Sequence, residues 1–398
     1  MVLCQFVIIC SVGGRLHIQR GQVLKLNHGK KIKVAVIIGT RPEAIKLCPV
    51  IFGLREKSQQ FNLIVIVTGQ HREMLDQILK EFEVEPQYNL DVMEKNQSLA
   101  RLTEKVIPAL DNILLKENPD ILLVQGDTTT SLVAGLVAFY HKIMIGHVEA
   151  GLRTYNKYFP FPEEINRKLI SGFTDINFAP TQSAADNLTR EGIPQDKVFI
   201  TGNTVIDALF YVLGNYKSKW TEFQNCENRQ ILITAHRREN FGMPLKNICQ
   251  ALVKLIRKYD DIEITYPVHK NPNVQKVIYE YLSDVERVNL IEPVNYFEFV
   301  SLMNESYLIL TDSGGIQEEA PSLGKPVLVL RDETERPEAI AAGTVKLVGT
   351  DTDVIVKETS ILLENEEVYS EMANAINPYG DGKASGRIAE IILSNFKG

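Results

Sequence analysis

The stretch Leu310-Thr311-Asp312-Ser313-Gly314-Gly315-Ile316-Gln317-Glu318-Glu319 predicts a sharp turn from a strand into a helix. It begins at the end of a short apolar run, Ser313 is a favourable N-cap, and two glycines open a helical pattern. Unpaired backbone N–H groups and the absence of Cβ atoms at Gly314 and Gly315 suit a bound phosphate. Glu319 lies one turn beyond Gly315, where a carboxylate repels phosphate but suits the hydroxyl groups of a ribose. The stretch therefore favours a nucleotide-sugar site, with an ordinary strand-to-helix turn as the alternative.

The chain is long enough for two domains, because 398 residues exceed what a single hydrophobic core usually supports. From Lys31 onward, apolar strand-like runs alternate with helical stretches such as Leu99 to Lys116 and Ser131 to His141. This alternation predicts two doubly wound α/β domains that face a cleft. A polar stretch, Lys217 to Arg229, separates two series of strands. The expected strands are Ile32 to Ile38, Leu63 to Val67, Ile121 to Val124, Ile143 to Val148, Ile176 to Ala179, Val198 to Ile200, Gln230 to Thr234, Ile262 to Tyr266, Val288 to Ile291, Tyr307 to Leu310, Val327 to Leu330 and Val345 to Leu347.

Composition and charge argue against a nucleic-acid or anionic-membrane partner. Hydrophobic residues make up 44% of the chain and charged residues 23%, with a net charge of −7 and a pI near 5.7. The five cysteines are scattered, without the close pairing of a metal or redox motif, so we expect a reduced, cytoplasmic setting. The apolar segment Val2 to Val12 is shorter than the roughly 20 residues that span a bilayer and has no basic region before it. We interpret it as an extra strand, a disordered extension or an upstream-start artefact.

Two cations and a helix start follow the first strand of the series, in Gly39-Thr40-Arg41-Pro42-Glu43-Ala44-Ile45-Lys46. Ligands of doubly wound sheets lie beyond the carboxyl ends of the strands, so this position favours a binding site. Thr40 and Glu43 predict a capping box at the start of the helix. Arg41, in a rigid turn, suits paired bonds to a diphosphate, whereas Lys46 by itself is more typical of a solvated surface base.

Three carboxylates lie along the first series of strands, two of them just after a strand and the third at the start of a helix. They are Asp127 in Gln125-Gly126-Asp127-Thr128-Thr129-Thr130, Glu149 in His147-Val148-Glu149-Ala150-Gly151-Leu152-Arg153, and Glu163 in Phe161-Pro162-Glu163-Glu164-Ile165-Asn166-Arg167. Taken singly, Asp127 could cap the following helix, and Glu163 with Arg167 could form a surface ion pair. Together they predict a carboxylate-rich active site at one edge of the sheet.

Two histidines follow strands of the second series. His236 lies in Ala235-His236-Arg237-Arg238-Glu239-Asn240-Phe241-Gly242, and His269 lies in Tyr266-Pro267-Val268-His269-Lys270-Asn271-Pro272. The pKa range of an imidazole suits proton transfer or a bond to phosphate, and a structural role is the alternative for each. The sequence has no His-x-x-x-His or paired-cysteine set, so we expect no metal.

The motifs together resemble the non-hydrolysing UDP-N-acetylglucosamine 2-epimerase family. The resemblance runs in the same order and spacing from about Lys31 to the C-terminus, and only the N-terminal extension departs from it. Its segments are Gly39-Thr40-Arg41-Pro42-Glu43, Gly126-Asp127-Thr128-Thr129-Thr130, His147-Val148-Glu149-Ala150-Gly151-Leu152-Arg153, Thr201-Gly202-Asn203-Thr204-Val205-Ile206-Asp207, His236-Arg237-Arg238-Glu239-Asn240, Ser313-Gly314-Gly315-Ile316-Gln317-Glu318-Glu319 and Asn377-Pro378-Tyr379-Gly380-Asp381-Gly382.

The resemblance implies a glycosyltransferase type B fold after an extension at residues 1–31. Residues 32–201 and 385–398 would form a Rossmann-like domain that carries the acid/base residues. Residues 202–384 would form a second Rossmann-like domain that binds UDP. The last helix, Ser385 to Phe396, would cross back to the first domain, and the hinge would lie near Gly202 rather than in the polar stretch.

The implied reaction interconverts UDP-N-acetylglucosamine and UDP-N-acetylmannosamine for cell-envelope polysaccharide synthesis, without a cofactor or a metal. UDP is eliminated to leave 2-acetamidoglucal and is then added back with the opposite configuration at C2. Departure of UDP builds positive charge at C1 and acidifies the C2 hydrogen, which a carboxylate can then take. Inversion requires protonation of the other face, by a second acid/base group or after the intermediate has moved.

The family correspondence also assigns roles to residues. Asp127, Glu149 and Glu163 would be catalytic in proton transfer, with His236 on the phosphate side. UDP would be held by Arg41, Lys46, Ser313, Gly314, Gly315 and Glu319, and Arg167 would orient the sugar or Glu163. Bacterial relatives bind a second UDP-N-acetylglucosamine as an activator. The matching positions here are Gln70, Glu73, Arg237 and His269, although Glu73 and Asn96 differ from some members.

The resemblance further implies a homodimer, for which Leu99 to Lys116 offers a helical face, although its periodicity alone indicates core. Three other functions stay open. A type B glycosyltransferase would share the fold and the donor site but would need an acceptor. A hydrolysing epimerase would release free N-acetylmannosamine and UDP. A non-catalytic sensor would bind the nucleotide sugar unchanged, and the several carboxylates argue against it.

Overall fold

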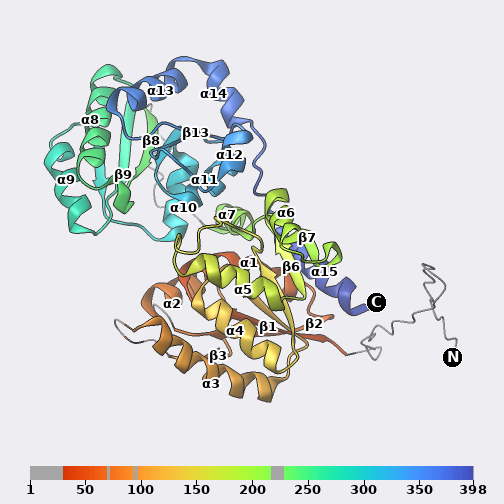
Figure 1. Ribbon diagram of the computed structural model, residues 1–398. Helices are drawn as coiled ribbons and strands as arrows, with labels where there is room; N and C mark the ends of the chain where they lie inside the picture. The colour runs from red at the N-terminus through yellow and green to blue at the C-terminus, as the bar shows by residue number, and fades with distance from the viewer. Residues whose placement is uncertain (1–29, 70–71, 93, 95–96, 217–227, 398) are drawn as a thin grey trace.

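The computed structural model describes residues 30–69, 72–92, 94, 97–216 and 228–397. Within these residues the chain forms two parallel β-sheets, one of seven strands and one of six, with helices packed against them (Figure 1). The predicted α/β class is therefore confirmed. The apolar segment expected at residues 2–12 lies outside the described residues, as does most of the polar stretch that begins at residue 217.

The first sheet has the strand order β3-β2-β1-β4-β5-β6-β7, and all its strand pairs are parallel. Its strands are β1 (Ile32–Ile38), β2 (Phe61–Val67), β3 (Tyr88–Asn89), β4 (Ile121–Gln125), β5 (Met144–Val148), β6 (Ile176–Ala179) and β7 (Val198–Ile200). The helices of this part are α1 (Arg41–Glu56), α2 (Arg72–Glu81), α3 (Leu99–Glu117), α4 (Thr129–Tyr140), α5 (Glu163–Phe173), α6 (Gln182–Arg190) and α7 (Thr204–Asn215).

The second sheet has the order β10-β9-β8-β11-β12-β13, again with parallel pairs. Its strands are β8 (Arg229–Thr234), β9 (Ile262–Pro267), β10 (Val288–Ile291), β11 (Leu308–Thr311), β12 (Val327–Val329) and β13 (Val345–Leu347). The helices that follow are α8 (Met243–Lys258), α9 (Pro272–Leu282), α10 (Tyr296–Glu305), α11 (Gly314–Glu319), α12 (Pro337–Ala341), α13 (Thr352–Glu364), α14 (Glu366–Ala373) and α15 (Ala384–Lys397).

Every expected strand is present, with ends that shift by two residues at most. The sequence reading missed β3, because its two residues form no apolar run. Helix α4 begins at Thr129, before the expected Ser131, because the Thr128 side chain accepts a hydrogen bond from the Ser131 N–H and caps the helix. The helix expected at Leu99 to Lys116 ends one residue later, at Glu117.

The apolar stripe of α3 belongs to the core of the protein itself. Leu102, Val106, Leu110 and Leu114 are buried at helical spacing and pack with residues of β1 and β4. This stripe is therefore not a face for a second subunit. No helix within the described part of the chain is both long and apolar enough to cross a membrane.

The strand orders place the functional motifs at equivalent points of the two sheets. In the first sheet the order reverses between β1 and β4, which are followed by the segments at Gly39 and Gly126. In the second it reverses between β8 and β11, which are followed by the segments at Ala235 and Asp312. Crevices form at such switch points, beyond the carboxyl ends of the strands. The stretch Leu310 to Glu319 therefore leads out of β11, one of the two strands that flank a crevice.

Two segments that connect the domains touch each other. Gly202 has a φ of +88°, and a Cβ there would lie 3.3 Å from the Gly380 Cα. The N–H of the next residue, Asn203, donates to the Tyr379 carbonyl at 2.6 Å. Glycine adopts this backbone conformation without strain and permits the close approach. The chain beyond Gly380 continues into α15, which packs on α1 of the first domain (Figure 1).

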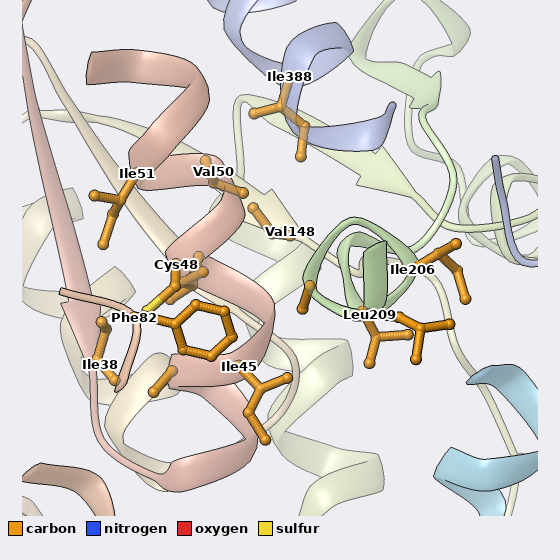
Figure 2. Close-up of a cluster of buried hydrophobic side chains, with 14 of the residues drawn as sticks. Ile38, Ile45, Cys48, Val50, Ile51, Phe82, Val148, Ile206, Leu209 and Ile388 are labelled. Atoms are coloured by element: carbon orange, nitrogen blue, oxygen red, sulfur yellow. The ribbon is translucent and has the colours of Figure 1, made fainter. Parts of the chain in front are cut away.

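Helix α7 packs on α1 and α15 and also contacts α10 and α11 of the second domain. Figure 2 shows Ile206 and Leu209 of α7 and Ile388 of α15 around the side chains of α1. An aromatic cluster extends this core between the domains, because the Phe82 ring lies 5.4 Å from Tyr211 of α7 and 4.9 Å from Phe297 of α10. Buried apolar surface therefore joins the two domains. The boundary at residues 201 and 202 stays a prediction.

Candidate functional site

Two adjoining cavities lie at the carboxyl ends of the strands, and they share Pro42, Lys46 and Arg336. The first, of about 460 Å³, is called the α11 cavity. The sequence-predicted residues that line it are Arg41, Lys46, His236, His269, Ser313, Gly315 and Glu319. The second, of about 700 Å³, is called the α5 cavity. The sequence-predicted residues that line it are Lys46, Asp127, Glu149, Glu163 and Arg167.

The turn after β1 joins the N-termini of α1 and α4. Thr40 is the N-cap of α1, and its side chain accepts from the Glu43 N–H at 3.5 Å. The predicted capping box is only half formed, because the Glu43 carboxylate accepts from the Gly39 N–H at 3.0 Å rather than from Thr40. Its other oxygen accepts from the hydroxyl groups of Thr128 at 2.7 Å and Ser131 at 2.8 Å. Burial raises the pKa of Glu43, although these hydrogen bonds act to lower it.

Asp127 is held at its backbone and at its side chain. The interpretation of Asp127 as a helix cap is wrong, because Thr128 caps α4. Arg167 donates to the Asp127 carboxylate, and the Asn166 amide donates to its carbonyl at 2.8 Å. His147 Nε2 donates to the preceding carbonyl, that of Gly126, at 2.7 Å. Burial lowers the pKa of His147 to about 4, so this imidazole is neutral.

Glu163 is the first residue of α5 and lies on the wall of the α5 cavity. The predicted surface ion pair with Arg167 is wrong, because Arg167 pairs with Asp127 and lies 3.6 Å from Glu164. One carboxylate oxygen of Glu163, Oε2, is buried and has no hydrogen-bond partner among the described residues. This oxygen is therefore available to a ligand in the cavity.

Glu149 is the most highly connected carboxylate of the site. It follows β5 with a φ of +63°, a conformation that costs a non-glycine residue free energy and is often retained at functional sites. Lys46 Nζ lies 2.6 Å from its Oε1 and 2.7 Å from its Oε2. The side-chain amides of Gln125 and Asn203 donate to the same carboxylate. The expectation that Lys46 is a solvated surface base is therefore wrong, because this lysine forms a buried ion pair with Glu149.

The charges around Glu149 keep it ionised. Burial acts to raise its pKa, but the Lys46 ammonium, the Arg336 guanidinium and the Asn203 hydrogen bond together lower it. For Lys46, burial acts to lower the pKa, while Glu149 and Glu318 raise it. Both partners are therefore charged at neutral pH, and Glu149 has the protonation state of a general base.

Glu318 and Arg336 form a second ion pair on the opposite wall. Arg336 Nε lies 2.6 Å from Glu318 Oε1, and Asn203 Nδ2 donates to Glu318 Oε2 at 3.1 Å. Glu318 and Asn203 belong to the sequence motifs but had no predicted role, and Arg336 was not among the predicted site residues. Arg336 lies in the segment after β12, so the rule of reading residues beyond strand ends could have found it.

The Ser313-Gly314-Gly315 turn faces Arg336. Ser313 occupies the N-cap position of α11, but its side chain makes no capping hydrogen bond, contrary to the expected cap. A Cβ at Gly314 would lie 3.5 Å from the Arg336 guanidinium, and one at Gly315 would lie 3.6 Å from Glu319 Oε1. The glycines therefore leave room beside a cation and a carboxyl group.

Glu319 is buried and accepts a hydrogen bond from the Tyr296 hydroxyl at 2.8 Å. Burial raises the pKa of Glu319 to about 8, with a further contribution from Glu318 and against the hydrogen bond from Tyr296. The carboxyl group is therefore largely protonated at neutral pH in the absence of a ligand.

His236 is fixed by its backbone. Asp312, at the end of β11, accepts hydrogen bonds from the N–H groups of His236 at 2.8 Å and Arg237 at 2.7 Å. The His236 ring stacks on that of His269, with centroids 5.4 Å apart and planes 10° apart. Burial lowers the pKa of His236 against the attraction of Asp312. Both histidines line the α11 cavity.

Some predicted site residues are not brought to these cavities. Gly314 and Arg237 do not line either one, although both are next to residues that do. Gln70 and Asn96 lie outside the described residues, and Glu73 lies in α2 with a side chain that is not described. Among the described residues, no group of three or more His, Cys, Asp or Glu side chains is placed to hold a metal ion.

Comparison with known proteins shows which family the chain belongs to. A family model described as UDP-N-acetylglucosamine 2-epimerase matches residues 54–393. The chain belongs to this family. One family member, the UDP-N-acetylglucosamine 2-epimerase of Neisseria meningitidis, is 53% identical over 372 residues, which cover 92% of this chain and all of the relative.

The solved structure of an epimerase from Neisseria meningitidis, bound to UDP-GlcNAc, has a TM-score of 0.82 and 52% identity to this chain. It covers 91% of this chain and 100% of that one. A glycosyltransferase of kitacinnamycin also matches, with a TM-score of 0.64 and 10% identity over 92% of this chain and 100% of that one, which shows the fold alone. The glycosyltransferase type B fold implied by the family resemblance is therefore confirmed.

Proposed function

We propose that this epimerase-family protein interconverts UDP-N-acetylglucosamine and UDP-N-acetylmannosamine by eliminating UDP and adding it back. The observation that carries the proposal is the division of the cleft. Asp127, Glu149 and Glu163 line the α5 cavity, while the Ser313 turn and Glu319 line the α11 cavity. A nucleotide sugar that spans both cavities has its sugar among carboxylates and its UDP beside the glycines.

The nucleotide half of the proposal rests on the α11 cavity. The diphosphate would lie against Gly315, which lines the cavity, and beside its neighbour Gly314, with Arg41 and Lys46 as cations. The ribose hydroxyl groups would bond to Glu319. His236 would contact the phosphate side. Arg336 lies where the two cavities meet, so its charge would stabilise the negative charge that develops on departing UDP.

The sugar half of the proposal rests on the α5 cavity. A carboxylate takes the C2 proton, the C2–H electron pair forms the C1–C2 double bond, and the C1–O bond breaks with its electrons going to the β-phosphate of UDP. Protonation of the opposite face at C2 and return of the UDP oxygen to C1 then give the epimer. Glu149 is ionised, Asp127 is oriented by Arg167, and Glu163 has a free buried oxygen, so the cavity holds several groups for this proton transfer.

The proposal extends to the setting of the enzyme. A homodimer, a cytoplasmic location and supply of the product to cell-envelope polysaccharide synthesis follow from the family resemblance. A second UDP-N-acetylglucosamine would bind as an activator near Arg237 and His269, with Gln70 and Glu73 as further matching positions. Initial rates that rise sigmoidally with substrate concentration in the wild type, and more weakly in Arg237→Ala, would support the activator site.

The activity is tested by incubating the protein with UDP-N-acetylglucosamine alone in deuterated water and following the mixture by NMR. We expect intact UDP-N-acetylmannosamine with deuterium at C2. Net accumulation of free UDP and free N-acetylmannosamine would establish the hydrolysing reaction instead. An unchanged substrate that is turned over only when a sugar acceptor is added would establish a glycosyltransferase.

A further inference from the structure

Asn203 lies where the chain crosses between the domains, and its side chain contacts one carboxylate from each. Nδ2 donates to Glu149 Oε1 and to Glu318 Oε2, both at 3.1 Å. All three residues are buried. A side-chain amide carries two N–H donors, so both donors of Asn203 are used by carboxylates that face each other across the cleft.

The orientation of this amide is fixed by its surroundings. Asn203 is the N-cap of α7, and its Oδ1 accepts from the Val205 N–H at 3.1 Å, so the amide nitrogen must face the carboxylates. The backbone N–H of Asn203 donates to Tyr379, and the preceding residue, Gly202, packs on Gly380. The side chain is therefore held by both segments that join the domains.

The charges around the amide form two ion pairs. Lys46 pairs with Glu149 within the first domain, and Arg336 pairs with Glu318 within the second. Without a donor between them, the two carboxylates would repel each other in a region from which water is largely excluded. The charged and titratable groups that act on Glu149 or adjoin it are Lys46 of α1, His147 of β5, Glu318 of α11 and Arg336 before α12.

We propose that Asn203 is a positioning residue that links the orientation and ionisation of Glu149 to the position of Glu318 in the second domain. This inference rests on the proposed function, because it gives Glu149 a role in moving the C2 proton. It adds a coupling between the acid/base group on one wall and the nucleotide-holding domain on the other. Asn203 itself does not touch either cavity.

Two substitutions separate this role from helix capping. Asn203→Ser keeps a favourable N-cap but removes the two amide N–H donors, and the single O–H on its shorter side chain cannot bond to both carboxylates. Asn203→Asp also keeps the cap and nearly the same shape, but it replaces the amide donor by an oxygen atom of a third carboxylate. Asn365→Ser is the matched control, because Asn365 is exposed and caps α14 by accepting from two backbone N–H groups at 3.1 Å.

The measurements are kcat, UDP affinity by calorimetry, and the pH dependence of kcat/KM. In Asn203→Ser we expect kcat to fall about tenfold to a hundredfold, while the Kd for UDP stays within about threefold of the wild-type value. Loss of a hydrogen bond to the ionised form moves the acidic limb of the pH profile upward. In Asn203→Asp the limb moves further, by about one to three pH units, because like charges then meet. Asn365→Ser keeps the wild-type kcat and pH profile.

A wild-type pH profile in both Asn203 variants, with kcat within about twofold of wild type, overturns the proposal. Asn203→Ser adds no charge and keeps a good N-cap, so it is expected to fold. Loss of cooperative unfolding in this variant also overturns the proposal, because Asn203 would then be needed for the fold and not only to position Glu149. If the wild type does not epimerise, the proposed function fails, and the coupling is read from melting temperatures. Asn203→Asp should then lose stability relative to wild type between pH 5 and pH 8, and a constant difference contradicts the coupling.

Discussion

Replacing Lys46 by Met is expected to destabilise the protein, and to do so more strongly as the pH rises. In the wild type, Lys46 Nζ lies 2.6 Å from Glu149 Oε1, and the two side chains are only 18% and 5% exposed. Removing one partner from such a buried pair typically costs about 3–5 kcal/mol. Methionine fills a similar volume, so the cost arises from the carboxylate that is left without its cation.

The pH dependence follows from the pKa of Glu149. Without the ammonium, burial becomes the dominant influence and raises this pKa above its unfolded-state value. A carboxyl group with a raised pKa contributes stability below the unfolded-state pKa and loses that contribution as the pH rises through the folded-state pKa. In the wild type the pKa is lowered, so stability is instead present above the unfolded-state value. The difference between the two proteins therefore grows from pH 5 to pH 8.

The assay is thermal unfolding followed by circular dichroism at pH 5 and pH 8. With an unfolding entropy of about 2.1 cal/mol/K per residue, 1 kcal/mol corresponds to about 1.2 °C for a chain of 398 residues. We therefore expect a drop of about 4–6 °C at pH 8 and a smaller one at pH 5. Lys57→Met is the control, because Lys57 makes an equally short pair, 2.6 Å, with Glu390, but the side chains are 31% and 64% exposed. Such a pair is worth about 0–1 kcal/mol. Equal drops in melting temperature in the two variants, or the same drop in Lys46→Met at pH 5 and pH 8, would refute the reasoning.

Three further variants, one of them with a matched control variant, test other parts of the structure. Burial raises the Glu319 pKa to about 8, so the wild type loses stability as the pH rises through that value. In urea unfolding, the stability of Glu319→Gln relative to wild type should therefore increase between pH 6 and pH 9. A difference that stays constant over this range contradicts the prediction. Gly151→Ala should cost more than about 2 kcal/mol in the same assay, since φ is +92° and a Cβ would lie 2.1 Å from the Ala184 carbonyl oxygen. Gly172→Ala, where a Cβ meets nothing within 4 Å, should be neutral or stabilising, and a similar loss in both contradicts the steric argument. Phe82→Ala should cost about 3–5 kcal/mol by calorimetry, because its ring fills the core between the domains, and an unchanged melting temperature contradicts that placement.

The fold was predictable because the strands of parallel sheets are buried on both faces. Such strands read as continuous apolar runs, and Ile32–Ile38 was expected and found with the same bounds. The same sheets fix where the loops go, so Asp127 and Glu149 could be placed at one edge without knowledge of their contacts. The short strand Tyr88–Asn89 had no such signal and was missed.

The partners of the site residues were not predictable, because they depend on packing between distant segments. Helical spacing favoured a pair between Glu163 and Arg167, yet Arg167 bonds to Asp127, which precedes it by 40 residues. Lys46 had the local pattern of a surface base, but it forms a buried ion pair with Glu149 in the cleft. The contacts of Asn203 form only because the fold brings Glu149 and Glu318, from different domains, to the same side-chain amide. No local sequence pattern predicts a contact of this kind.

The rate of deuterium exchange at C2 in Glu149→Gln tests the central claim most directly. The claim is that first-domain carboxylates move the C2 proton while the second domain holds UDP. General acid/base groups typically contribute about 10²–10⁴-fold to a rate. We therefore predict that Glu149→Gln exchanges the C2 hydrogen of UDP-N-acetylglucosamine at least about a hundredfold more slowly than wild type, with a UDP Kd within about threefold. Exchange at the wild-type rate, with UDP still bound, would contradict the account.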